Sequence, residues 1–447
     1  MNEISRVTTD EAAALEGWLQ RLEILHPKKI DLSLDRVETV LSALNIRTPP
    51  YRVLTVAGTN GKGSCVALLE SIYVRAGYRV GSYTSPHLWR FNERIRLNGA
   101  EASDAQIVDI FSEIDSVRGQ TTLSYFEFST VAALVYFVRR QAEIAILEVG
   151  LGGRLDAVNA VDADLALITS IDLDHERWLG STREEIGAEK AGILRSGKPA
   201  VVADRAPPNS VLERAATLGA ELRRLGVDFD YRRHPDGSWD FLGKASAVEG
   251  LPRSPLAGQV QYANAAGCLA AVEALQARLP VEGCDLAGAI AAVRLPGRVQ
   301  RASLGGVEWI FDVAHNPAAA RVLADELARD PAPGRTLAIF GLMADKDLAG
   351  VLEPIAESVD AWLVTRAKSE RASDPRALTA ALEELGCTDV REAVDIASAC
   401  DLAARETGAG DRVVTFGSFQ IVGPAMEALE LYSRPSSGED SAKWTGA

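Results

Sequence analysis

The amino-acid sequence predicts an α/β protein of two domains, each with a mainly parallel sheet covered by helices. Short apolar runs rich in β-branched residues alternate with amphipathic segments along the chain, which is typical of strand–helix–strand units. A chain of 447 residues also exceeds what one hydrophobic core usually supports. The pair Pro296-Gly297 stands between two series of such runs and is a turn or hinge signal.

The strands of the two series fix the predicted domain limits. In the first series we expect strands at residues 52–56, 79–83, 143–149, 164–170 and 199–202, and helices around 66–76, 104–114, 128–140 and 184–194. In the second we expect strands at 308–313, 336–340, 361–365 and 412–416, with helices between them. The domains are therefore predicted at 1–296 and 297–432, and the serine-, glycine- and charge-rich stretch 433–447 as a disordered tail.

Composition and charge exclude several classes of function. The formal net charge of −15 argues against a nucleic-acid partner, which normally needs a basic face. No apolar run is long enough to span a membrane, and the polar N-terminus shows no signal peptide. The five cysteines are widely spaced without a Cys-x-x-Cys pair, which favours reduced thiols. We expect a cytoplasmic protein and, since no exposed apolar repeat suggests a partner, a monomer.

A glycine-rich stretch directly after the first expected strand predicts a phosphate-binding loop. It reads Gly58-Thr59-Asn60-Gly61-Lys62-Gly63-Ser64 and precedes a segment of helical spacing. Glycines let backbone N–H groups approach phosphate oxygens, and the start of a helix adds positive partial charge. Lys62 supplies a charge for the outer phosphates, and the Ser64 hydroxyl can reach magnesium. A bare glycine-rich turn is the alternative, but the lysine and the strand–helix context favour a nucleoside triphosphate.

Four further loops carry polar groups, and they contain Ser85, Glu148, His175 and Lys190. The hydroxyl, the carboxylate and the imidazole each follow an expected strand. Because the carboxyl ends of parallel strands meet at one edge of a sheet, these three groups can converge on magnesium beside a triphosphate. Simpler interpretations exist: Ser85 is a turn residue before a proline, and His175 is a solvated surface histidine. Glu148 is harder to dismiss because burying an unpaired carboxylate is costly.

The second series repeats the form of a strand followed by a polar loop. Asp312 ends an expected strand in the second domain and could hold a ribose or nucleobase, while Arg298 could reach phosphates. Asp312 could equally cap the helix that starts near Pro317.

Taken together and in order, these motifs resemble those of folylpolyglutamate synthases. The matching stretches are 58–64, 84–88, 148–156, 174–175, 189–193, 295–298 and 312–317. The chain is most similar to the bacterial bifunctional dihydrofolate synthase/folylpolyglutamate synthase family within the Mur ligase superfamily, from about residue 19 to about residue 425. The resemblance implies a P-loop ATPase-like Mur ligase domain followed by a smaller Rossmann-like C-terminal domain, with the active site in the cleft between them.

The resemblance also implies roles for individual residues. The nucleotide-binding positions are Asn60, Gly61, Lys62, Gly63, Ser64, Asn264, Arg298 and Asp312. Ser85 and Glu148 would ligate one magnesium ion and His175 a second, and Lys190 matches a lysine that is carbamylated in the family. Lys62, His175 and Lys190 would be the catalytic residues. The positions that match the pterin site are Ile30, Asp31, Leu32, Ser124, Tyr125, Phe126, Glu127, Leu155, Asp156 and Ala157.

The implied reaction joins L-glutamate to a carboxylate. ATP would phosphorylate the carboxylate of dihydropteroate, or of tetrahydrofolate and its polyglutamates, and the amine of L-glutamate would attack the acyl phosphate. Domain closure around 295–298 would bring Arg298 and Asp312 to the nucleotide. The open alternatives are a monofunctional folylpolyglutamate synthase, another Mur-type amino-acid ligase and a non-catalytic nucleotide-binding regulator. The chain departs from the family at Val260 and Gln420, where relatives often have histidine.

Overall fold

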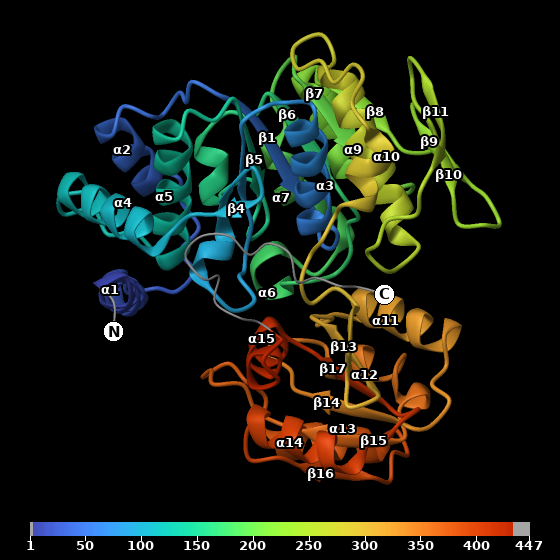
Figure 1. Ribbon diagram of the computed structural model, residues 1–447. Coiled ribbons are helices and arrows are strands. Elements are labelled where there is room, and N and C mark those ends of the chain that lie inside the picture. Colours follow the sequence, from blue (N-terminus) through green and yellow to red (C-terminus); the bar gives the residue numbers. More distant parts are fainter. Residues whose placement is uncertain (1–2, 432–447) are drawn as a thin grey trace. The chain divides into compact units, whose positions relative to one another are not determined.

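The computed structural model describes residues 3–431, which fall into two compact units, one ending at Leu295 and the other beginning at Pro296. In each unit helices lie on both faces of a sheet (Figure 1). This confirms the predicted α/β class and the mainly parallel sheets. The expected tail at 433–447 lies outside the described residues. No helix within 3–431 is long and apolar enough to cross a membrane.

The first unit is built on an eight-stranded sheet in the order β4-β3-β2-β5-β1-β6-β7-β8. Its strands are β1 (Arg52–Ala57), β2 (Val80–Tyr83), β3 (Ile95–Leu97), β4 (Ala100–Glu101), β5 (Ile144–Glu148), β6 (Leu165–Ile168), β7 (Pro199–Val202) and β8 (Glu221–Arg224). Neighbouring strands are parallel from β2 to β8 in that order, whereas the β2–β3 and β3–β4 pairs are antiparallel.

Helices cover both faces of this sheet. They are α1 (Glu3–Leu25), α2 (Asp35–Ala43), α3 (Lys62–Arg75), α4 (Asp104–Val117), α5 (Tyr125–Arg139), α6 (Glu176–Leu179), α7 (Arg183–Lys190), α8 (Asn209–Leu218), α9 (Val260–Leu275) and α10 (Leu286–Ala291). Alternate residues of β1 face opposite sides: Val53 and Ala57 pack with α1, α2, α4 and α5, whereas Leu54 and Val56 pack with α3 and α9. The central strands are therefore buried on both faces, as parallel strands usually are.

The differences from the sequence prediction include several element boundaries and one small sheet. The helix expected from residue 66 begins at Lys62, and the one expected to reach residue 194 ends at Lys190 and continues as a 3₁₀-helix, Ala191–Ile193. An antiparallel sheet of β9 (Asp230–Arg233), β10 (Trp239–Leu242) and β11 (Ala247–Leu251) was not predicted. Its strands are short, and β9 has the polar sequence Asp-Tyr-Arg-Arg. β9 therefore lacks the alternation of apolar and polar residues that predicts a strand.

The second unit is built on a six-stranded sheet in the order β12-β13-β17-β14-β15-β16, with only β12 antiparallel. Helices α11 to α13 pack on one face, and α14 and α15 contact its central strands. The elements are β12 (Gln300–Leu304), β13 (Val307–Asp312), α11 (Pro317–Arg329), β14 (Thr336–Phe340), α12 (Leu348–Leu352), β15 (Ala361–Val364), α13 (Pro375–Glu384), β16 (Val390–Glu392), α14 (Ile396–Glu406), β17 (Arg412–Phe416) and α15 (Phe419–Ala428).

Candidate active site

The strand order of the first unit sets the candidate residues side by side. Strands β2, β5, β1 and β6 are consecutive neighbours in the parallel part of the sheet, so the loops at their carboxyl ends lie in a row. Ser85 follows β2, Glu148 ends β5, the loop 58–61 follows β1, and His175 lies beyond β6. Strands β2 and β5 lie on one side of β1, and β6 to β8 lie on its other side. Open α/β sheets bind ligands at such a switch point, outside the carboxyl ends of the strands.

The loop after β1 has a shape that only glycine permits at two positions. Gly58 has φ of 149°, and a Cβ there would lie 1.7 Å from Thr169 Oγ1. The Thr169 hydroxyl instead donates to the carbonyl of Asn60 at 2.7 Å. Gly61 has φ of 88°, and a Cβ there would lie 2.7 Å from Asn264 Oδ1. Asn264, a predicted nucleotide contact on α9, is therefore packed directly over the loop.

Lys62, Gly63 and Ser64 form the first turn of α3, which corrects the prediction that they belong to the loop. Gly61, in the left-handed region, is the residue before the helix. First-turn N–H groups have no partner within a helix, and the helix dipole makes this end positive. The correction strengthens the predicted function, because the start of α3 now coincides with the lysine and serine of the motif.

Two lysines converge on one carbonyl of this loop. Lys62 Nζ donates to Gly58 O at 3.0 Å and to Thr59 O at 3.1 Å. Lys190 Nζ, from the last turn of α7, donates to the same Gly58 O at 2.8 Å and is buried. Burial, together with the charge of Lys62, lowers the pKa of Lys190 to about 7. A lysine that loses its proton near neutral pH has a nucleophilic amine.

Glu148 and Ser85, the expected ligands of one ion, are in direct contact. The Glu148 carboxylate is buried at the end of β5 and accepts the Ser85 N–H at 3.0 Å. A Cβ at Gly63 would stand 3.8 Å from each Glu148 carboxylate oxygen, so this carboxylate faces the first turn of α3. The backbone N–H of Ser85 thus helps to orient the Glu148 carboxylate.

His175 lies in a loop that is fastened to the phosphate-binding loop. The Thr59 hydroxyl donates to the carbonyl of Asp172 at 2.9 Å and accepts its N–H at 3.0 Å. His175 has φ of 53° and precedes α6, and its N–H donates to Asp174 Oδ1 at 2.8 Å. Its ring is partly exposed, with Nε2 3.9 Å from Asp174 Oδ2. Within 3–431 no group of three or more His, Cys, Asp or Glu side chains is arranged to hold a metal ion by itself.

Of the segments that match the pterin site, 30–32 and 124–127 are joined by Arg36. Its guanidinium contacts both Asp31 and Glu127, the latter at 2.8 Å. Ser124 caps α5 by accepting the Glu127 N–H, and the Glu127 carboxylate accepts the Ser124 N–H at 2.7 Å. Arg36 was not predicted as a site residue, because nothing in the spacing of the chain relates residue 36 to residue 127.

The third such segment holds a buried carboxyl group. Asp156 accepts the N–H groups of Leu151 at 2.8 Å and Val158 at 3.0 Å, at the start of a 3₁₀-helix, Ala157–Ala160, that includes Ala157. Burial raises its pKa to about 7. The preceding Leu155 is partly buried.

The second segment approaches the backbone of the loop that follows Glu148. A Cβ at Gly150 would lie 2.6 Å from the ring of Phe126, so the ring covers the backbone two residues after Glu148. Tyr125, the residue before Phe126, is partly buried beside Phe91 and Arg94. The first turn of α5 therefore connects the segments matched to the pterin site with the loop that carries the expected metal ligand.

In the second unit, Asp312 and Arg298 occupy neighbouring positions. The Asp312 carboxylate accepts the N–H groups of Val299 at 2.8 Å and Ala314 at 2.7 Å, and burial raises its pKa. The alternative that Asp312 caps α11 is wrong, because Asn316 does so by accepting the Ala319 N–H. The charge of Arg298 favours the ionised Asp312.

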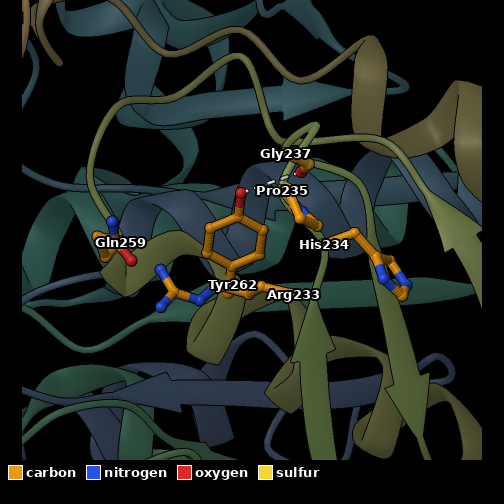
Figure 2. A pocket seen from close by; sticks show the side chains of 6 residues that line it. All are labelled: Arg233, His234, Pro235, Gly237, Gln259 and Tyr262. Atoms are coloured by element: carbon orange, nitrogen blue, oxygen red, sulfur yellow. Dashed lines mark hydrogen bonds between the residues drawn. The ribbon is translucent and has the colours of Figure 1, made fainter.

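A separate pocket of about 610 Å³ lies between the β9–β10 turn and the start of α9 (Figure 2). It is lined by Arg233, His234, Pro235, Gly237, Gln259 and Tyr262. The Tyr262 hydroxyl donates to Gly237 O at 3.0 Å, and Arg233 stands 5.7 Å from the centre of its ring. Tyr262 and Asn264 are two positions apart on a helix and so point to nearly opposite sides. The pocket therefore lies on the side of α9 away from the phosphate-binding loop.

Comparison with known proteins shows the family of the chain. The Mur ligase middle domain matches residues 56–272, and the glutamate ligase domain of Mur ligases matches 297–419. The chain is 44% identical over 436 residues to the dihydrofolate synthase/folylpolyglutamate synthase of Escherichia coli K12, covering 98% of this chain and 100% of that protein.

Two solved structures share the fold. One is E. coli FolC in complex with DHPP and ADP, with a TM-score of 0.87, 43% identity, and coverage of 93% of this chain and 98% of that one. The other is the bifunctional folylpolyglutamate synthase/dihydrofolate synthase of Yersinia pestis with AMPPNP and a Mn ion, with a TM-score of 0.85, 42% identity, and the same coverages. On these grounds the chain belongs to the dihydrofolate synthase/folylpolyglutamate synthase family of Mur ligases.

Proposed function

We propose that this protein is an ATP-dependent ligase that joins L-glutamate to dihydropteroate, forming dihydrofolate, and to tetrahydrofolate and its polyglutamates. The observation that carries the proposal is the arrangement at the carboxyl end of β1. There Lys62 and Lys190 meet on the Gly58 carbonyl, and the buried Glu148 carboxylate faces Gly63. The relatives named above, with their bound nucleotides, support the same activity.

Amide formation from a carboxylate needs an activated acyl group. A carboxylate oxygen of the pteroyl or folyl substrate attacks the γ-phosphorus of ATP, ADP leaves, and an acyl phosphate forms. The amine nitrogen of L-glutamate then attacks the acyl carbon and loses a proton. The tetrahedral intermediate expels inorganic phosphate. Lys62 would neutralise charge on the transferring phosphoryl group, together with the N–H groups at the start of α3.

The donor set at this edge of the sheet fits a divalent cation. The Glu148 carboxylate and the Ser85 side chain offer oxygen ligands of the kind that magnesium prefers, and His175 would hold a second ion. A divalent ion held by these residues would supply positive charge that withdraws electron density from the phosphate groups. The Mn ion in the Yersinia pestis structure supports a divalent metal. Two magnesium ions in this chain are part of the proposal.

Lys190 is proposed to carry a carbamate. Its neutral amine would add to carbon dioxide, with loss of a proton, and a cation would become an anion beside Lys62. Burial supports this chemistry, because it lowers the pKa of Lys190 to about 7 and so provides the neutral amine. Arg298 and Asp312 are proposed as further ATP contacts from the second unit.

Product analysis by mass spectrometry tests the proposal. Purified protein is given ATP, magnesium and L-glutamate with either dihydropteroate or tetrahydrofolate, and Lys62→Ala serves as the inactive control. One glutamyl residue gained by each substrate is the expected result. Product from tetrahydrofolate alone would indicate a monofunctional folylpolyglutamate synthase. ATP turnover that neither pterin stimulates would indicate another Mur-type ligase, and no turnover at all would indicate a regulator.

Two expectations about the whole protein stay predictions, namely a monomeric state and a cytoplasmic location. All five cysteines are free thiols.

A further inference from the structure

A cluster of polar side chains outside the phosphate-binding loop joins three parts of the first unit. It consists of His26 directly after α1, Asp31 in the same loop, Arg36 on α2, Thr122 shortly before α5 and Glu127 in the first turn of α5. Arg36 is central to it. One of its nitrogens, Nη1, donates to the Asp31 carboxylate at 3.2 Å, and the other, Nη2, donates to Asp31 O at 2.7 Å and to the Glu127 carboxylate at 2.8 Å.

We propose that Arg36 is a positioning residue for the pteroyl substrate, holding the segments 30–32 and 124–127 in one arrangement. The inference rests on the proposed function, which assigns those two segments to the pterin site. Residues 26–34 form no helix or strand, so their course depends on side-chain contacts. The bond from Arg36 to the backbone carbonyl of Asp31 fixes that course directly.

The consequences of losing Arg36 fall unequally on its two partners. Asp31 would keep a bond from His26 Nε2 at 3.1 Å and the nearby Lys28. The Glu127 side chain is only 5% exposed, and it would keep the Ser124 N–H but lose its cation. An ionised carboxylate buried without its partner is costly, so the start of α5 is expected to shift.

Such a shift would also move residues beside the proposed reaction site. The first turn of α5 contains Phe126, whose ring covers Gly150. A merely structural ion pair would lower stability when broken but leave the affinity of the folded enzyme for its pteroyl substrate unchanged. A positioning role predicts a selective change in that affinity.

Steady-state kinetics of Arg36→Gln separates these roles. The KM for dihydropteroate is expected to rise about tenfold, which corresponds to about 1.4 kcal/mol of lost substrate binding. The KM for ATP is expected to stay within about twofold. Arg36→Lys, which can reach one carboxylate but not hold the bridge, should give an intermediate KM for dihydropteroate. Arg36→Lys also tests the proposal if Arg36→Gln does not fold.

Arg96→Gln is the matched control. Arg96 pairs with Glu70 at 3.1 Å, with side chains 16% and 9% exposed, and joins β3 to α3. Its loss should lower the melting temperature and leave the KM for dihydropteroate unchanged. If both Arg36 variants keep the wild-type KM for dihydropteroate, the positioning role is wrong while the proposed function stands. A wild-type protein that makes no product from dihydropteroate would overturn both.

Discussion

Replacing Gly63 by alanine is expected to separate the stability of this protein from its activity. Gly63 lies in the first turn of α3 and has ordinary helical backbone angles. The nearest atoms to an added Cβ are Leu295 Cδ2 at 3.5 Å and the two Glu148 carboxylate oxygens at 3.8 Å, all of which are ordinary contacts. The folded chain therefore accepts the methyl group without strain. Alanine is favoured over glycine in helices by up to about 1 kcal/mol.

The same methyl group occupies space that the chemistry needs. It would stand between the start of α3 and the Glu148 carboxylate, where the proposed phosphate and metal must approach. We expect kcat to fall at least about tenfold, or about 1.4 kcal/mol of lost transition-state stabilisation. The melting temperature should hold steady or rise by about 2 °C.

Thermal denaturation and a coupled assay of ADP release measure the two quantities. Gly17→Ala is the control, because Gly17 is also helical and an added Cβ would meet nothing within 4 Å. That variant should gain stability and keep full activity. A Gly63→Ala enzyme of wild-type kcat would refute the reasoning that glycine is required for space rather than for backbone shape.

Three further predictions address the charged groups of the site. Lys62→Ala and Glu148→Ala are each expected to lower turnover at least about a hundredfold, roughly 2.7 kcal/mol, in single-turnover assays; near-normal rates in both would contradict the assigned site. Arg298→Ala should chiefly raise the KM for ATP, and a change confined to glutamate or folate would show that its proposed nucleotide contact is wrong. Because burial lowers the pKa of Lys190 to about 7, its neutral fraction, and with it carbamate formed from labelled bicarbonate, should increase as pH rises from about 6 to about 8 and be absent in Lys190→Arg. The unfolded lysine keeps its proton up to its ordinary value of 10.5, so this group makes the free energy of unfolding rise with pH between about 7 and that value.

The parts of the site that follow strands were predictable from the sequence. Parallel strands place their carboxyl ends at one edge of a sheet, so Ser85 and Glu148 could be expected from the sequence to lie close together. The strand order put β2 beside β5 and confirmed that expectation through the Ser85 N–H bond to Glu148. The motif around Lys62 was predictable for the same reason, although the start of its helix was not.

Contacts that depend on tertiary packing were not predictable. Lys190 reaches the Gly58 carbonyl only because α7 ends beside the loop after β1. Arg36 meets Glu127 because α2 packs against α5, and no local pattern encodes that pairing. The sheet of β9 to β11 was not predictable either. It is recognised by the pairing of its strands and not by an alternation of apolar and polar residues along them.

The contact between Gly61 and Asn264 limits how this protein can change during evolution. A side chain at position 61 would collide with the amide of Asn264, and the left-handed backbone there would add strain. A replacement at position 61 is therefore tolerated only if position 264 becomes smaller in the same lineage, and the nucleotide contact proposed for Asn264 would then be lost. The two positions, far apart in the chain, are expected to vary together or not at all.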